Sequence, residues 1–138
     1  MSKLNVTRRA ADNGVAIIDL AGDVTIGGGN KLLQQTVRSL VADGQKQIIL
    51  NLADVSYIDS SGLGELVASF TTIEKSGGEM KLLNLTKRVT ELMVITKLLT
   101  VFDVYESEAT AVAAFGTKGS ELTTGPLNPS GLTEGATV

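Results

Sequence analysis

The sequence predicts an α/β domain in which helices pack on a mixed, mainly parallel sheet of about four or five strands. Two observations support this prediction. Short aliphatic runs, which are typical of strands covered on both faces, alternate with longer segments whose apolar residues recur at helical spacing. In chain order the pattern is strand, strand, helix, strand, helix, strand, helix, strand, helix. A chain of 138 residues is long enough for one such domain with a buried core.

Two strands are expected before the first helix. Residues 3–8 alternate weakly between apolar and polar, as in an edge strand, whereas residues 15–22 are nearly all aliphatic. A glycine-rich connection, residues 27–29, leads into a helix that is expected to end at Asp43-Gly44. The apolar residues of this helix are Leu32, Leu33, Val37, Leu40 and Val41.

The middle of the chain predicts two interior strands with a helix between them. Residues 47–52 and 79–85 are the apolar runs, and a right-handed crossover would place them on either side of that helix. The helix is expected over residues 63–75, before a Ser-Gly-Gly sequence. Its apolar stripe consists of Leu63, Leu66, Val67, Phe70 and Ile73.

Two further helices and a short strand complete the predicted fold. Thr86 is the expected cap of one helix, and Ser107 precedes an acidic residue in the first turn of the other. A short strand is predicted between them, at residues 100–105. The central strands should include residues 15–20, 47–52 and 79–83. The helices should bury Leu33, Val37, Leu66, Val67, Phe70, Leu92 and Val112.

The chain changes character after Phe115. Residues 116–138 are rich in glycine, threonine and serine, contain both prolines of the chain and show no apolar periodicity. Such a segment cannot bury enough apolar surface to offset the entropy of ordering it. We therefore expect one domain over residues 1–115 and a flexible tail over residues 116–138.

The composition excludes several functions. There is no cysteine and no histidine, which excludes a disulfide, a zinc site built on these residues and a Ser-His-Asp hydrolase. The net charge is −3, with 12 Lys and Arg against 15 Asp and Glu, which does not indicate nucleic-acid binding. No apolar run reaches the ~18 residues that a membrane-spanning helix needs. We therefore expect a cytoplasmic protein that is not an enzyme, needs no cofactor or metal, and contacts neither nucleic acid nor membrane.

The segment SYIDSSGLGELV, residues 56–67, lies where a predicted strand turns into a helix, and three interpretations of it compete. In the first, Asp59, Ser60 or Ser61 caps the helix by accepting hydrogen bonds from its free N–H groups. In the second, one serine is a nucleophile, which is disfavoured because no base lies nearby in the sequence. In the third, one serine is modified by a partner protein.

Two glycines in this segment, Gly62 and Gly64, favour the third interpretation. A glycine in the first turn of a helix costs ~1 kcal/mol relative to alanine, so another backbone or a bulky ligand is expected to come close to this turn. A phosphate on a serine there would lie near the positive end of the helix dipole and would add about −1.5 to −2 charges beside Asp59 and close to Glu65. Such a charge would disrupt a closely packed interface, as a switch requires.

The sequence from about Leu4 to Phe115 resembles the STAS domain of bacterial anti-sigma factor antagonists, also called anti-anti-sigma factors. The most specific part of the resemblance is DVSYIDSSGLG, residues 54–64. It is supported by GGEMKLLNL, residues 77–85, and by SEATAV at the start of the last helix. The resemblance implies a STAS-like α/β fold.

The resemblance also implies a function in the regulation of transcription by partner switching. The unphosphorylated protein would bind an anti-sigma factor that is itself a serine kinase of the histidine-kinase-like ATPase fold, and would thereby free the sigma factor. Phosphorylation by that kinase would end the binding, and a metal-dependent serine phosphatase would reset it. The implied acceptor is the residue directly after the aspartate, Ser60, with Ser61 as the alternative. The partner-binding residues would be Asp23, Thr25, Asp59, Ser61, Gly62, Leu63, Gly64 and Glu65.

One segment departs from the family pattern. The family often has Gly-Glu-hydrophobic-Asp after its second strand, whereas this chain has Gly22-Asp23-Val24-Thr25, followed closely by the glycine run. We expect this loop to lie beside the Ser60 turn, where the change would alter the partner or the efficiency of phosphorylation. The alternative function is a non-phosphorylated STAS scaffold, an interaction module of a signalling or lipid-transport complex. Such a scaffold does not need an acceptor serine flanked by an acid and glycines.

Overall fold

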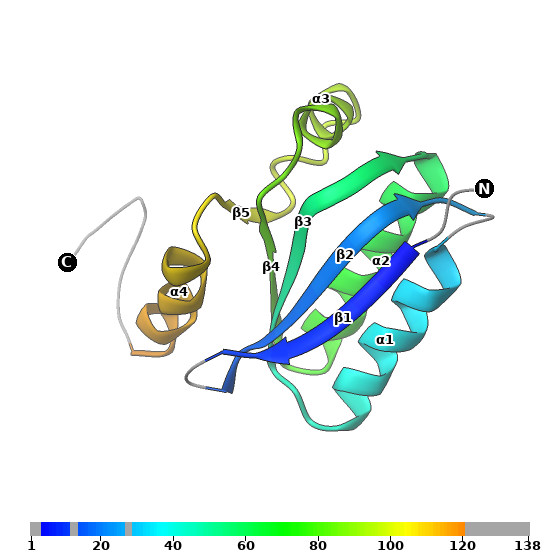
Figure 1. The fold of residues 1–138 in the computed structure, drawn as a ribbon. Helices are drawn as coiled ribbons and strands as arrows, with labels where there is room; N and C mark the ends of the chain where they lie inside the picture. The colour runs from blue at the N-terminus through cyan, green and yellow to red at the C-terminus, as the bar shows by residue number, and fades with distance from the viewer. Residues whose placement is uncertain (1–3, 12–13, 27–28, 121–138) are drawn as a thin grey trace.

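The computed structural model describes residues 4–11, 14–26 and 29–120, with residues 116–120 as backbone only. Within these residues, one sheet of five strands is combined with four helices (Figure 1). In chain order the elements are β1 (Leu4–Ala10), β2 (Ala16–Val24), α1 (Asn30–Ala42), β3 (Gln47–Ile58), α2 (Ser60–Lys75), β4 (Glu79–Leu83), α3 (Lys87–Ile95), β5 (Asp103–Tyr105) and α4 (Glu108–Ser120).

The strands follow one another across the sheet in the order β1-β2-β3-β4-β5. β1 pairs antiparallel with β2, and each later pair of neighbours is parallel. α1 and α2 cover one face of the sheet, α4 covers part of the other, and α3 lies beyond the end at which the parallel strands finish (Figure 1). The predicted α/β fold is therefore confirmed, with residues 15–20, 47–52 and 79–83 in or beside its three central strands.

The sheet is buried on both faces because successive side chains of a strand point to opposite sides. In β2, Ile18 and Leu20 belong to the larger core cluster, which lies against α1 and α2. Ile17, the residue before Ile18, belongs to a smaller cluster with Phe115 of α4. Burial on both sides explains why β2 is an almost continuous aliphatic run in the sequence.

The helices bury their predicted apolar residues to different degrees. Leu33, Val37 and Leu66 are fully buried, with at most 1% of their surface exposed. The other predicted residues are only partly buried and pack against the two core clusters: Val67, Phe70, Leu92 and Val112. Thr86 accepts a hydrogen bond from the N–H of Val89 at 3.2 Å, which confirms it as the cap of α3.

Two central strands run farther than the sequence predicts, and the last strand is shorter. β2 ends at Val24 and β3 at Ile58, because their parallel pairing continues past Asn51 through two register shifts. Beyond Leu52, only Val55 and Ile58 of β3 are buried, so this part of the strand lacks an aliphatic run. β5 comprises three residues rather than the six expected at 100–105.

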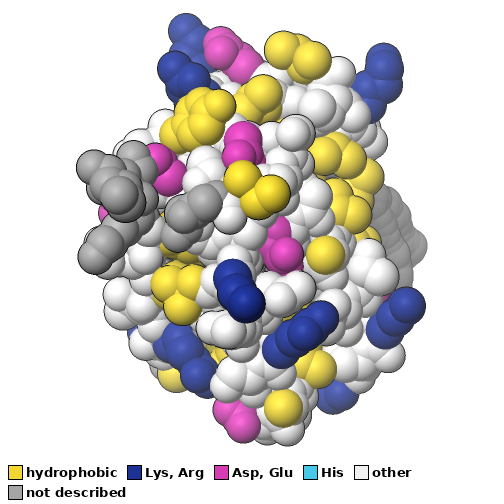
Figure 2. Space-filling view, turned by 90° about the vertical axis from the view of Figure 1, so that its right-hand side faces the viewer, with side chains coloured by type: hydrophobic (Ala, Val, Ile, Leu, Met, Phe, Trp, Pro, Cys, Tyr) yellow, Lys and Arg dark blue, Asp and Glu magenta, His cyan; other side chains and the backbone are white. Residues whose placement is uncertain are grey.

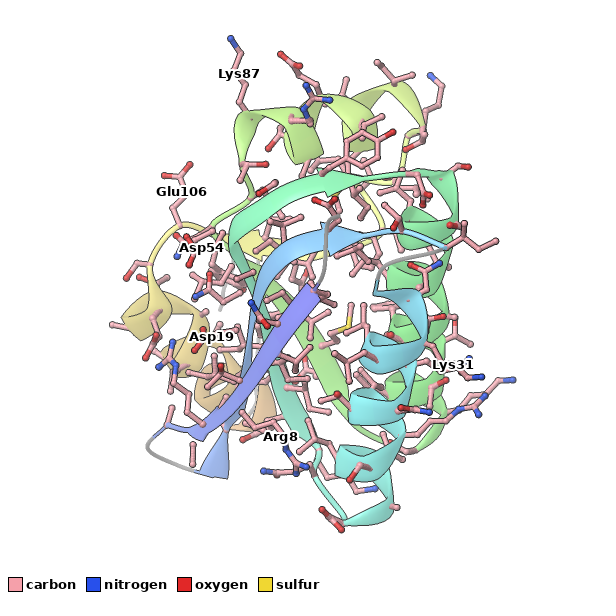
Figure 3. All side chains as sticks on the ribbon, turned by 45° about the vertical axis from the view of Figure 1, so that its right-hand side comes forward. Arg8, Asp19, Lys31, Asp54, Lys87 and Glu106 are labelled. Atoms are coloured by element: carbon pink, nitrogen blue, oxygen red, sulfur yellow. The ribbon has the colours of Figure 1, made fainter. Side chains whose placement is uncertain are left out.

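The side chain of Arg9 in β1 links α4 to the sheet through two ion pairs. Its guanidinium donates to Asp19 of β2 (Nε to Oδ2, 2.5 Å) and to Glu108 at the start of α4 (Nη2 to Oε1, 2.7 Å). These contacts with Arg9 hold the pKa of both carboxyls below the usual value. Asn51 of β3 also donates to Asp19, at 2.8 Å. Figure 3 shows Asp19 on the side of the sheet that carries α4.

α4 continues past the predicted domain limit at Phe115 and ends at Ser120. Ser107 precedes it, and its hydroxyl accepts a hydrogen bond from the N–H of Thr110 at 3.4 Å. Residues 121–138 lie outside the described residues, so the flexible tail stays a prediction.

Candidate functional site

The candidate site is built where β2 and β3 finish side by side. Val24 and Ile58 are paired in the parallel register, so the segments that follow them meet at the same edge of the sheet. The N–H of Asp59 donates to Val24 O at 3.4 Å, and the N–H of Ile26 donates to Asp59 Oδ2 at 3.3 Å. The expectation that the loop after β2 lies beside the Ser60 turn is therefore confirmed.

Asp59 is the residue that caps α2. Its backbone is extended, and its Oδ1 accepts hydrogen bonds from the N–H of Gly62 at 2.8 Å and from Ser61 Oγ at 2.6 Å. The Ser61 hydroxyl and then the Gly62 N–H hold the pKa of Asp59 below its usual value. Asp59 is therefore an ionised cap at neutral pH, and of the three predicted cap candidates it is the one that the structure selects.

The two serines of the motif differ in their surroundings. Ser61 is partly buried, and its hydroxyl proton is donated to Asp59. Ser60, the first residue of α2, is exposed, and its hydroxyl has no hydrogen-bond partner among the residues that the structure describes. An active site of another protein can therefore reach Ser60 Oγ without breaking the cap of α2.

The two glycines of the motif have different surroundings in the structure. A Cβ on Gly62 would lie 2.0 Å from Val24 O and 2.7 Å from Cγ1 of Ile58, so α2 can approach the ends of β2 and β3 only without a side chain there. Gly64 is exposed, and a Cβ there would meet no atom within 4 Å. The expectation that another backbone comes close to this turn is therefore confirmed at Gly62, which is buried against the end of β2, whereas no such neighbour explains Gly64.

Two more of the predicted contact residues are buried, one of them fully and the other in part. Leu63 is only 3% exposed and belongs to the larger core cluster. Glu65 is partly buried, which raises the pKa of its carboxyl, while a long hydrogen bond from Ser69 (3.5 Å) and the charge of Arg38 on α1 act in the opposite direction. Leu63 therefore cannot offer its side chain to a partner, and Glu65 can do so only in part.

Asp23 and Thr25 lie at the end of β2 and just after it, both partly buried. Asp23 is paired in the sheet with Tyr57, which is 43% exposed. The guanidinium of Arg88 lies over the Tyr57 ring, 5.7 Å from its centre. The structure thus brings Asp23, Thr25 and Asp59 together at the edge of the sheet next to Ser60.

The sequence analysis missed one exposed residue of this site, Ile26, which is 82% exposed directly after Thr25. The available signal was an isoleucine that precedes three glycines and belongs to no apolar period. Figure 2, which faces the right-hand side of Figure 1, shows apolar side chains scattered between acidic and basic ones on that side of the molecule.

The described part of the chain shows neither a metal centre nor a membrane-spanning helix. No group of three or more acidic side chains there is placed to hold a metal ion. No helix among those residues is both long and apolar enough to cross a membrane. Within the same residues, the Ser60 hydroxyl forms no hydrogen bond to another side chain and is accessible at the start of α2.

Comparison with known proteins gives consistent results. Residues 8–111 match the STAS domain. The anti-sigma-B factor antagonist of Bacillus subtilis is 33% identical over 101 residues, which cover 73% of this chain and 90% of that protein.

Solved structures show the same fold. The crystal structure of an anti-sigma factor antagonist from Mycobacterium paratuberculosis has a TM-score of 0.74 at 21% identity, covering 83% of this chain and 96% of the other. The Bacillus cell fate determinant SpoIIAA in its phosphorylated form has a TM-score of 0.64 at 19% identity, covering 80% of this chain and 99% of the other. The domain match runs from β1 into α4, and the similarity to the B. subtilis protein extends over most of both chains. The chain therefore belongs to the STAS-domain family and is a relative of the anti-sigma factor antagonists.

Proposed function

We propose that this chain is an anti-sigma factor antagonist that is switched off by phosphorylation of Ser60. In its unphosphorylated form it binds an anti-sigma factor, a serine kinase of the histidine-kinase-like ATPase fold, which then releases its sigma factor. The kinase transfers a phosphoryl group from ATP to Ser60 Oγ, and the complex dissociates. A metal-dependent serine phosphatase removes the phosphate and restores binding. The chain itself is the substrate in this cycle and not an enzyme.

The accessibility of Ser60 is the observation that carries this proposal. Its hydroxyl is exposed at the first residue of α2 and has no partner among the described residues. The neighbouring Ser61 already donates its proton to Asp59 at 2.6 Å. A kinase that used Ser61 would first have to break this hydrogen bond to the capping residue, whereas Ser60 can be phosphorylated with the hydrogen bonds of Asp59 intact.

The charge at this turn explains how one phosphate ends binding. Asp59 is ionised at neutral pH, as aspartates ordinarily are, and the Ser61 hydroxyl and the Gly62 N–H lower its pKa further. No ion pair joins Asp59 to a basic side chain within the described residues. A phosphoryl group adds about −1.5 to −2 charges, so the charge of the turn changes from −1 to about −2.5 to −3. A partner surface packed closely against one carboxylate is then repelled.

The proposed contact surface surrounds Ser60 and consists of residues that the structure leaves at least partly open. They are Asp23, Thr25, Asp59, Ser61, Gly64 and Glu65, to which the exposed Ile26 is added. Gly62 and Leu63 are left out of this surface because both are buried. Their role in the proposal is to hold α2 against the sheet so that Ser60 stays at its edge.

Phosphopeptide mapping tests the acceptor directly. The chain is incubated with ATP and each candidate kinase of this fold from the same genome, and its intact mass and phosphorylated peptides are determined. We expect a single phosphoryl group on Ser60. Ser60→Ala should abolish it, whereas Ser61→Ala and Ser56→Ala, an exposed serine of β3, should retain it.

Binding of the same kinase to the variants tests the switch. Ser60→Ala keeps the side chain small and cannot be phosphorylated, so this variant should still bind the kinase. Ser60→Asp adds a negative charge beside Asp59 and should weaken binding, since like charges placed together at an interface cost several kcal/mol. Phosphate on Ser61 alone would move the acceptor by one residue. Absence of phosphate from both serines with every candidate kinase would favour the alternative, a non-phosphorylated STAS scaffold.

A further inference from the structure

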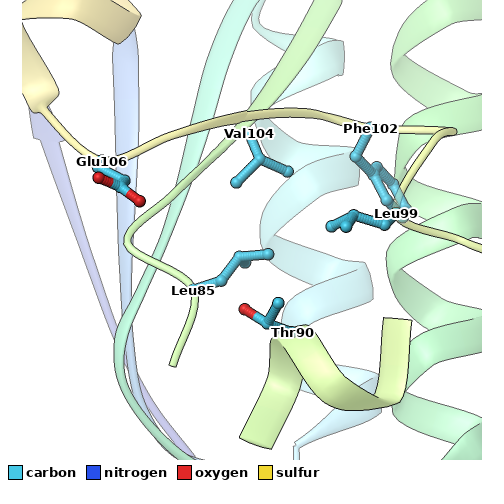
Figure 4. Close-up of a pocket in the computed structure, with 6 residues that line it drawn as sticks. All are labelled: Leu85, Thr90, Leu99, Phe102, Val104 and Glu106. Carbon is cyan, nitrogen blue, oxygen red and sulfur yellow. The ribbon is translucent and has the colours of Figure 1, made fainter. Parts of the chain in front are cut away.

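A hollow lies at the margin of the sheet, between α3, β5 and the segments that flank them (Figure 4). Its volume is about 280 Å³. None of its lining residues belongs to the Ser60 turn. The lining residues are Leu85, Thr90, Leu99, Phe102, Val104 and Glu106.

The wall of this hollow is mainly apolar. Phe102 is buried, whereas Leu85, Leu99 and Val104 pack against the larger core cluster and keep part of their surface exposed. An apolar group placed here would remove that surface from water, which is favourable. The volume is slightly below the ~300–1,000 Å³ typical of ligand sites, so the ligand must be small.

The two polar residues of the lining offer hydrogen-bond acceptors. Thr90 Oγ1 donates its proton to Thr86 O at 2.9 Å, so its lone pairs remain for a donor. Glu106 is exposed, and as a carboxylate it can only accept. Within the described residues, no lysine or arginine forms an ion pair with Glu106. A ligand that complements Glu106 therefore carries a positive charge and an N–H donor.

The hollow lies next to the carboxyl ends of two parallel strands, β4 and β5. Leu85 follows the end of β4 by two residues, and Glu106 directly follows the end of β5.

We infer that this hollow binds a small amphiphilic amine. The apolar body of the amine packs against the four apolar side chains, and its ammonium group pairs with the Glu106 carboxylate. The site is independent of the proposed phosphorylation of Ser60, because it uses none of the same residues.

The site is tested by titrating the ¹⁵N-labelled full-length protein with three six-carbon probes and following the amide signals by NMR at neutral pH. Hexylamine is cationic, hexan-1-ol is neutral and hexanoate is anionic. We expect saturable shifts of the amides of the lining residues, with hexylamine binding up to about fivefold more tightly than hexan-1-ol, as for an exposed ion pair, and hexanoate binding most weakly. Equal binding of hexanoate and hexylamine, or the absence of saturable shifts at these amides, would overturn the proposal.

Matched variants separate the contribution of the Glu106 charge to binding from that of the apolar hollow. Glu106→Gln keeps the shape of the side chain and should lower the affinity for hexylamine to that for hexan-1-ol, whereas Glu74→Gln, an exposed position of α2, should leave it unchanged. Unchanged hexylamine affinity in Glu106→Gln would contradict the proposal. Val104→Phe should fill the hollow and abolish binding of all three probes. If that variant does not fold, NOEs between bound hexylamine and the methyl groups of Leu85 and Leu99 in the wild type provide the deciding measurement, and their absence counts against the site.

Discussion

Ser61 donates its hydroxyl proton to Asp59 Oδ1 at 2.6 Å, and this hydrogen bond distinguishes two serines that are adjacent in the sequence. Ser61 is hydrogen-bonded to the residue that caps α2, whereas the exposed Ser60 hydroxyl has no partner among the described residues. The other carboxylate oxygen of Asp59 accepts from the N–H of Ile26, so the same side chain holds the loop after β2. Asp59 thus places the loop and the start of α2 around Ser60.

The two serines should therefore differ in their effect on stability. Ser60→Ala should change the free energy of unfolding by no more than about 0.5 kcal/mol, as for other surface substitutions. Ser61→Ala should lower it, because the ionised Asp59 loses a hydrogen bond. Urea denaturation followed by circular dichroism measures both. A loss of ~0.5–2 kcal/mol in Ser60→Ala would instead show that Ser60 acts as the cap.

Alanine at the two glycines should have opposite effects. Gly62→Ala places a Cβ 2.0 Å from Val24 O, a backbone atom that cannot move aside freely, and should destabilise the fold by ~1–3 kcal/mol or more. Gly64→Ala meets open space on an exposed face of α2 and should stabilise it by up to ~1 kcal/mol, since alanine is the better helix former. Thermal unfolding of both variants compares them directly. Similar changes in the two would contradict the packing described for Gly62.

The contribution of Asp59 to stability should depend on pH. Its pKa in the fold is lowered by the Ser61 hydroxyl and the Gly62 N–H, below the value of about 3.9 for an unperturbed aspartate. Its ionised form therefore stabilises the fold above the unfolded pKa, and this stabilisation is lost as the pH falls through the folded pKa. Asp59→Asn should destabilise the protein at pH 7, and its difference from the wild type should narrow below about pH 4.

Urea denaturation at neutral pH and at several acidic pH values measures this dependence. Asp54→Asn is the matched control, because Asp54 is an exposed aspartate of β3 that caps no helix. A difference between Asp59→Asn and the wild type that stays constant down to acidic pH would argue against the ionised cap.

Arg9 should hold α4 to the sheet through Asp19 and Glu108. The side chains of both ion pairs are 30–43% exposed, so each pair should contribute only ~0.2–1 kcal/mol. Arg9→Ala should therefore cost about 1 kcal/mol and should reduce hydrogen-exchange protection in α4 more than in α1. Arg8→Ala is the control, because Arg8 forms one long, more exposed pair with Asp43 at 3.6 Å and should cost less. Equal loss of protection in both helices would contradict this role of Arg9.

The domain should not need the segment after α4. A chain that ends at Ser120 should keep its melting temperature within a few degrees of the full chain, since residues 121–138 have no apolar periodicity. In contrast, Phe115→Ala should cost ~3–5 kcal/mol, because Phe115 is only 2% exposed in the smaller core cluster. A large fall in melting temperature after the truncation would show that the segment packs on the domain.

The sequence by itself determined the order and type of the elements, because these depend on local periodicity. β2 is a continuous aliphatic run since both of its faces are covered, and α2 shows its apolar stripe at helical spacing. Thr86 was also predictable as a cap, because a single hydroxyl preceded the helical pattern. In each case the deciding residues lie within a few positions of one another in the chain.

Only the tertiary structure decided which residues of the motif cap α2, touch the sheet or remain open. Asp59, Ser60 and Ser61 are all suitable caps in sequence, and the choice depends on the extended backbone that carries Asp59 past Val24 and Ile26. Gly62 and Gly64 are likewise equivalent in sequence. They differ because residues two positions apart in a helix point to different sides. Gly62 faces Val24 O, the carbonyl oxygen of a strand more than thirty residues earlier, and Gly64 faces solvent.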